Sequence, residues 1–247
     1  MINFFRKTRQ KLANENRFLK YWRYAIGEII LVVAGILIAL QINNWNEARK
    51  KTQVEINTLT DLKTDLKENI NNLEQGILSA KEALKENLEL INRIQSKSQF
   101  DKSLHMEYGN FLGTWDPDFI YASFDNLKSA GVSLISNKTL RKKIIDVFEI
   151  KMEILDVSDM KRIDNLNLTM VLPIQKKYFH RDFTSTEEKW KIIPTNYDSM
   201  MADPEFFNVC TEMAYRQQRS INRFMEFNKG ARLLIEEIDA ELAKLNS

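Results

Sequence analysis

Glycine and proline are scarce in this chain, which has only seven glycines and four prolines in 247 residues. Charged residues make up 28% of it beside 44% hydrophobic ones, a mixture typical of long amphipathic helices and unlike that of short strands joined by turns. The composition therefore favours an all-α fold. At this length we expect one membrane helix and one sizeable extramembrane domain.

Cysteine and histidine are also too few for most metal sites. Cys210 is the single cysteine, so an intramolecular disulfide and a thiolate-rich metal site are excluded. Its place on an apolar helical stripe predicts a small core residue. The two histidines, His105 and His180, are not in metal-ligand spacing. We therefore expect no metal and no cofactor.

Motifs that carry catalysis are missing as well. The sequence contains no Gly-x-Gly-x-x-Gly, no phosphate-binding loop and no Gly-x-Ser-x-Gly elbow. His180-Arg181-Asp182 matches part of a kinase catalytic loop, but the other kinase elements are absent and we interpret the match as chance. Paired acids such as Glu187 and Glu188 alternate with lysines, as on a solvated face. The sequence thus predicts a protein that is not an enzyme.

Positive charge is concentrated at the N-terminus. Residues 1–50 carry nine Lys or Arg side chains against three acidic ones, a balance of +6. The remainder holds 27 basic and 31 acidic side chains, a balance of −4. A mildly acidic body lacks the clustered basic surface that neutralises phosphates, so no nucleic-acid partner is expected.

One long hydrophobic run follows the basic segment. Residues 24–42 hold a single charge in nineteen positions, close to the length that crosses a hydrocarbon core of about 30 Å. Tyr21, Trp22 and Trp45 flank it as an interfacial belt. We predict a cytoplasmic tail over residues 1–20, a transmembrane helix over 21–45 and an extramembrane domain over 46–247. The basic tail orients the domain away from the cytoplasm, and the absence of a small-x-small site predicts an uncleaved signal anchor.

Three residues inside this span are candidates for membrane or oligomer contacts. Glu28 is an ionisable group in hydrocarbon, which either reaches back to the interface near Arg23 or serves pairing in an oligomer or a proton-linked role. Gly35 lies seven residues further on the same face. Gly35 and Ala39 form a small-xxx-small pair that permits close helix approach. Both interpretations of Glu28 stay open.

Apolar spacing and capping residues predict several helices after the span. The first covers about 52–97 and carries an apolar stripe of Leu66, Ile70, Leu73, Ile77, Ala80, Leu84, Leu88, Ile91 and Ile94. Further helices are predicted over 117–130, 137–172 and 204–245, each begun by an Asp or Asn cap, with the longest loop over 183–203. Their inward stripes predict an antiparallel helical bundle.

An aromatic cluster precedes the second of these helices. Its members are Phe111, Trp115, Phe119, Tyr121 and Phe124. Aromatic rings dominate core energetics, so the cluster is interpreted first as the packed cap of the bundle. The alternative is an exposed patch or pocket for a ligand or a partner protein.

Three segments resemble a known family. Residues 24–29, YAIGEI, and 35–46, GILIALQINNWN, together with Leu134-Ile135-Ser136-Asn137-Lys138 as a weaker second signature, resemble an uncharacterised family of bacterial single-span inner-membrane proteins, a domain of unknown function. The resemblance implies an inner-membrane location with a periplasmic domain and adds no catalytic residue. It does draw attention to Glu28, which lies within the first signature.

These observations lead to three hypotheses of function. The first is an inner-membrane protein that presents a periplasmic helical bundle for protein–protein interaction, as a homo-oligomer or as a subunit of an envelope complex. The second is a ligand-binding sensory bundle acting through a partner, since a tail of about twenty residues has no room for a signalling domain. The third is a proton-linked membrane device, or a hydrolase, that uses Glu28.

Overall fold

The computed structural model describes residues 18–101, 117–155, 159–181 and 192–247. Most of the N-terminal tail and two of the five aromatic candidates, Phe111 and Trp115, lie outside these ranges. The chain divides into two compact units, Met1–Val54 and Glu55–Ser247.

The first unit is dominated by the start of α2 (Phe18–Ser96). Its large apolar side chains between Trp22 and Trp45 are all exposed, with Leu31 at 73%. Water is a poor solvent for such a surface, since each square ångström of apolar area left exposed costs about 25 cal/mol. Among the described residues, α2 is the single helix long and apolar enough to cross a membrane. The segment is therefore compatible with a membrane anchor.

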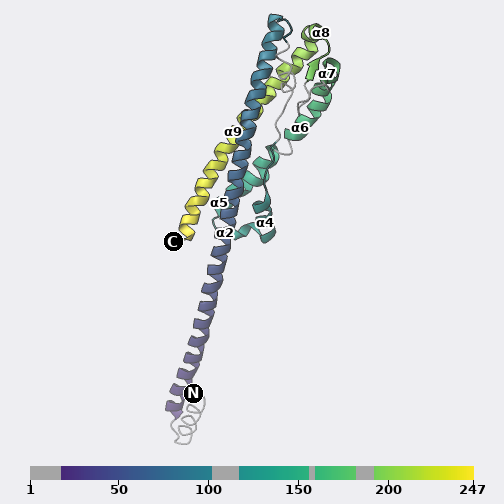
Figure 1. The fold of residues 1–247 in the computed structure, drawn as a ribbon. Coiled ribbons are helices and arrows are strands. Elements are labelled where there is room, and N and C mark those ends of the chain that lie inside the picture. The colour runs from purple at the N-terminus through teal and green to yellow at the C-terminus, as the bar shows by residue number, and fades with distance from the viewer. Residues whose placement is uncertain (1–17, 102–116, 156–158, 182–191) are drawn as a thin grey trace. The chain divides into compact units, whose positions relative to one another are not determined.

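The second unit is almost entirely helical, as predicted (Figure 1). It contains the remainder of α2 and the C-terminal helix α9 (Pro204–Leu245), with shorter elements between them. The shorter helices are α4 (Ala122–Ala130), η2 (Val132–Leu134), α5 (Lys138–Ile145), η3 (Asp146–Lys151), α6 (Asp159–Leu166), η5 (Asn167–Val171), α7 (Leu172–Tyr178) and α8 (Tyr197–Met201). Two strands, β1 (Phe179–Arg181) and β2 (Ile192–Pro194), complete the unit.

The two long helices pack antiparallel, as the side-chain pairs between them show. Lys63 pairs with Asp239, Glu74 with Arg232, and Asn87 with Gln217. As the residue number rises on α2 it falls on α9. The predicted antiparallel bundle is confirmed for this pair.

The sequence placed the start of the second helix wrongly. A helix beginning at Pro117 was predicted from the Asp-Pro pair, but residues 117–121 are not helical and α4 begins at Ala122. The reason lies on α2. The side-chain amide of Asn69 donates to the carbonyl of Ile120 at 3.0 Å and accepts from its N–H at 2.8 Å, so these backbone groups are satisfied without a helix. The predicted C-terminal end is correct, because Gly131 follows Ala130 with a φ of 98°.

The helix that Asn137 begins differs from its prediction in its far half. Asn137 caps it as expected, accepting from the N–H groups of Thr139 and Leu140. The wider π-helical turns η3 and η5 interrupt the α-helix, and α7 continues past Pro173 to Tyr178. A π-helical turn immediately before Pro173 accommodates a residue that cannot donate to the preceding turn.

The region predicted as the longest loop contains secondary structure. β1 pairs antiparallel with β2, with Phe179 opposite Pro194, and α8 follows Asn196, which caps it. The interpretation of 183–203 as a pure loop is therefore wrong for residues 192–201. No periodicity announced β2, because three residues are too few to show an alternation.

Two hydrophobic clusters form the core of the second unit. The larger joins the middle of α2 to α4, α5 and the C-terminal half of α9, with Leu66, Phe124 and Ile238 at its centre. The smaller joins Leu90 to α7, β1, α8 and the start of α9. Cys210 lies buried in it, as predicted, and burial raises the pKa of its thiol to about 12.

A polar layer separates the two clusters on the long helices. Asn87 is fully buried and donates from its amide to the carbonyl of Cys210 at 3.0 Å and to Gln217 at 3.2 Å. The predicted stripe was wrong here, because Leu88 is 52% exposed while Leu90 is buried. The true stripe passes through Asn87, which a pattern of apolar residues skips.

Candidate functional site

A row of polar side chains on α2 holds the chain between residues 118 and 136. Asn69 pairs with Ile120 as described above. Four residues before it, the Asp65 carboxylate accepts from the N–H of Ser123 at 2.8 Å. That N–H lies in the first turn of α4, where no residue of the helix itself can accept it. Asp65 therefore caps α4 from another helix.

The same row ends at a buried carboxylate, Glu55. Only 5% of Glu55 is exposed, and it accepts from both the N–H of Ser136 at 2.7 Å and its hydroxyl at 2.9 Å. The neighbouring Asn137 donates to Glu241 of α9 at 2.8 Å. This hydrogen bond, with a smaller contribution from Lys244, lowers the pKa of Glu241. The second signature segment is thus held between α2 and α9.

The described part of the aromatic cluster lies in the core. Phe124 is buried and stacks on Phe148 with ring centroids 5.1 Å apart, and Phe119 packs against Phe227 at 5.5 Å. Tyr121 is partly buried against the same cluster. Their burial favours the interpretation as a packed cap over that of an exposed patch, for these three residues.

The three candidates in the span lie on exposed parts of α2. Glu28 is partly exposed, while Gly35 and Ala39 are exposed. A Cβ added at Gly35 would meet nothing within 4 Å. The surface around Gly35 is therefore open, as close approach of another helix requires. Their role in self-association stays a prediction.

A second polar cluster surrounds Asp203, the residue that caps α9, and the sequence did not predict its other members. Asp203 accepts from the N–H of Glu205 at 2.8 Å, from Lys177 at 2.7 Å and from the hydroxyl of Tyr178. The Lys177 and Tyr178 hydrogen bonds lower the pKa of Asp203 to about 2 and raise that of Lys177. Burial first, and the bond to Asp203 next, raise the pKa of Tyr178. The Asp-Pro signal identified the cap but not its partners on α7.

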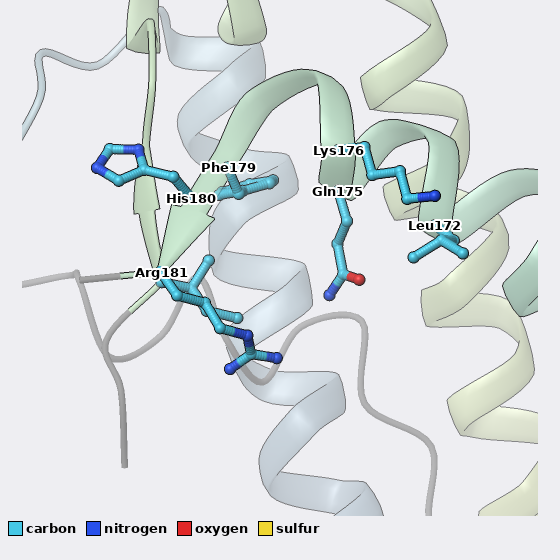
Figure 2. Close-up of a pocket in the computed structure, with 7 residues that line it drawn as sticks. Leu172, Gln175, Lys176, Phe179, His180 and Arg181 are labelled. Carbon is cyan, nitrogen blue, oxygen red and sulfur yellow. The ribbon is translucent and has the colours of Figure 1, made fainter. Parts of the chain in front are cut away.

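A cavity of about 170 Å³ lies between α7 and the β1–β2 pair (Figure 2). Its lining residues are Leu172, Gln175, Lys176, Phe179, His180, Arg181 and Ile192. None of them was a candidate from the sequence, where His180-Arg181 was interpreted as a chance match. The signal that could have found them is the gathering of basic residues over 176–181.

Comparison with known proteins gives one match. No curated protein and no solved structure matches the chain significantly. The matched stretch begins at Glu28, includes the polar row of α2 and ends two residues after Ser136. The resemblance to an uncharacterised family is therefore confirmed over that stretch. Residues 28–138 match DUF6090, a family of unknown function.

Proposed function

We propose that this protein is a single-pass inner-membrane protein that presents residues 55–247 in the periplasm as a docking module for other proteins. The observation that carries the proposal is the apolar surface of α2 between Trp22 and Trp45, exposed on every side. A second unit follows with its own core. Lipid covers the first segment, and the second is free to meet partners.

The orientation rests on the distribution of charge. Seven Lys or Arg residues precede the span within about twenty positions, against Arg49, Lys50 and Lys51 soon after it. This asymmetry favours a cytoplasmic N-terminus.

We further propose that the protein acts without catalysis. The buried acids Glu55 and Glu241 are both engaged with neighbouring segments of the chain, as is Asp203 at the start of α9. This use supports a structural role for them. The partner is either a second copy, meeting through the Gly35–Ala39 face, or another envelope protein.

Single-cysteine variants test the orientation. Cys210→Ala removes the native thiol, and Ser247→Cys or Thr8→Cys then introduces one on either side of the span. A membrane-impermeant maleimide is expected to label Ser247→Cys in intact spheroplasts and Thr8→Cys only after lysis. The reverse labelling would contradict the orientation, and loss of both from the membrane fraction would contradict the anchor.

Purification in mild detergent tests the docking role. The mass of the complex and the proteins that co-purify are measured for the native chain and for Gly35→Ile, with Gly27→Ile as the matched control at another open glycine. We expect a defined oligomer or a reproducible partner, with a homo-oligomer weakened by Gly35→Ile and not by Gly27→Ile. A clean monomer with nothing attached would sink the proposal.

A further inference from the structure

The cavity between α7 and the β1–β2 pair combines an apolar lining with basic groups. Leu172 and Ile192 are partly buried and Phe179 is almost fully buried, and together they supply its apolar surface. Gln175, Lys176 and Arg181 supply polar groups. Among the described residues, neither aspartate nor glutamate lines it.

Within the described part of the chain, the basic residues at this cavity differ in whether a carboxylate pairs with them. Lys177, the next residue along α7, is held by Asp203. By contrast, no carboxylate of the described residues pairs with Lys176 or with Arg181. Lys176 and Arg181 are both exposed, and two cations beside an apolar surface attract an anion to it.

The directions of the side chains single out Arg181. Figure 2 shows the guanidinium of Arg181 and the amide of Gln175 reaching into the same space between α7 and β1. Lys176 points away from that space on α7, and His180 lies on the other side of β1. Arginine presents a planar fork of donors that matches a carboxylate in two parallel hydrogen bonds. Lys176 then contributes only to the positive electrostatic potential around the cavity.

The volume limits the ligand. A cavity of about 150 Å³ admits benzene. At about 170 Å³ this open cavity has room for an apolar group of that size.

We propose that this cavity binds a small carboxylate carrying a ring-sized apolar group. Arg181, assisted by Gln175, binds the carboxylate, and the surface of Leu172, Phe179 and Ile192 receives the apolar group. The site lies within the second unit and does not depend on the proposed docking role or on the membrane anchor.

Titration calorimetry of the full chain in a non-ionic detergent tests the site, with sodium benzoate as the probe. Benzamide is the neutral analogue of the same shape, acetate lacks the ring, and inorganic phosphate is an anion without an apolar part. We expect saturable benzoate binding that exceeds binding of all three. Arg181→Gln is expected to weaken it at least about tenfold, as for loss of one charge-assisted pair. Arg219→Gln, an exposed arginine of α9 away from the cavity, is the matched control and is expected to change nothing.

Each other result overturns the assignment. If benzamide bound as tightly as benzoate, the charge of the ligand would play no role. If phosphate or acetate bound as tightly as benzoate, the apolar surface would play no role. Equal loss in Arg181→Gln and Arg219→Gln would place any binding elsewhere, and the absence of saturable benzoate binding would leave no such site.

Discussion

Two stretches of one helix, α2, differ in how their apolar residues are arranged. Between Trp22 and Trp45 the large apolar residues occupy every face and all are exposed. Between Leu59 and Ile94 most of them occupy one stripe, which packs into the core, while polar and charged residues cover most of the other faces and only Leu78 and Leu88 are exposed. Secondary structure is the same in both. The difference shows that the distribution of apolar residues around a helix, and not its helicity, decides whether the helix packs into a core or keeps an exposed apolar surface that suits a membrane.

Charge placed in the apolar stretch should break this contrast most strongly. The double variant Leu31→Arg/Leu37→Arg is expected to cost about 5–7 kcal/mol of insertion, since each arginine at a span centre costs about 2.5–3.5 kcal/mol. The protein should leave the carbonate-resistant membrane fraction. Leu78→Arg is the matched control, because Leu78 is 61% exposed on the same helix within the second unit. Equal release of both variants would contradict a membrane span.

Removal of side-chain atoms should destabilise the protein in the second stretch of α2 and not in the first. Leu66 is fully buried, so Leu66→Ala is expected to lower the free energy of unfolding of the second unit by about 2–5 kcal/mol. Leu31→Ala removes the same atoms from an exposed site and should leave that free energy unchanged. Urea unfolding in mild detergent, followed by pulse proteolysis, measures both. A matching loss in Leu31→Ala would show that the apolar stretch is part of the protein core.

The buried carboxylate at the start of the second unit gives a smaller effect. Glu55→Ala leaves the N–H and hydroxyl of Ser136 without their acceptor, and we expect a loss of about 1–3 kcal/mol in the same assay. Glu74→Ala, which breaks an exposed pair with Arg232, should cost less than about 1 kcal/mol. If Glu55→Ala and Glu74→Ala lowered the free energy of unfolding by similar amounts, Glu55 would have no special role in holding the segment around Ser136.

Acid should weaken the second unit and not the apolar stretch, which has no titratable side chain over residues 29–45. The pKa of Asp203 is about 2 in the folded protein against 3.8 ordinarily, so its contribution is complete above about pH 4 and is lost as the pH falls towards 2. Asp203→Asn keeps a capping residue but should flatten the fall of the urea midpoint over this range. Asp61→Asn, at an exposed site on α2, should not. An unchanged profile in Asp203→Asn would remove Asp203 from acid sensitivity.

The smallest expected effect is a gain at the end of α2. Lys97 adopts a φ of 53°, and the N–H of Ser98 bonds to the carbonyl of Arg93 at 3.1 Å, a left-handed helix end that favours glycine. Lys97→Gly is expected to raise the free energy of unfolding by about 0.5–1 kcal/mol. Lys85→Gly, within the helix, should lower it by about 1 kcal/mol. A loss in Lys97→Gly would contradict this geometry.

Much of the helical framework followed from the sequence because its signals are local. Asn137 and Asp203 were identified as caps, and both accept the N–H groups of the first turn. The inward stripe predicted for the helix over 204–245 is buried at eight positions from Phe206 to Ile238, and Leu242 and Leu245 pack against the core. A cap or a stripe depends on residues three or four positions apart, which the sequence displays directly.

The features that the sequence missed depend on distant partners. The pattern of apolar residues left Asn87 outside the predicted stripe, whereas in the structure α9 places Gln217 and the Cys210 carbonyl beside it. Pro117 was predicted to begin a helix, yet Asn69 on α2 bonds to both backbone groups of Ile120, and residues 117–121 are not helical. The Arg181 cavity required a hairpin of two three-residue strands, too short to be seen in a pattern.

The sequence by itself determined an apolar helix able to span a membrane, a mostly helical chain and the caps of two of its helices, because hydropathy and capping act within a turn or two of the chain. Only the tertiary structure decided where polar groups are buried. Glu55 beside Ser136, Asp203 beside Lys177 and Asn87 beside Gln217 join residues that lie far apart in the sequence. A polar group is buried only where folding supplies its partner, so its role becomes visible only once the chain has folded.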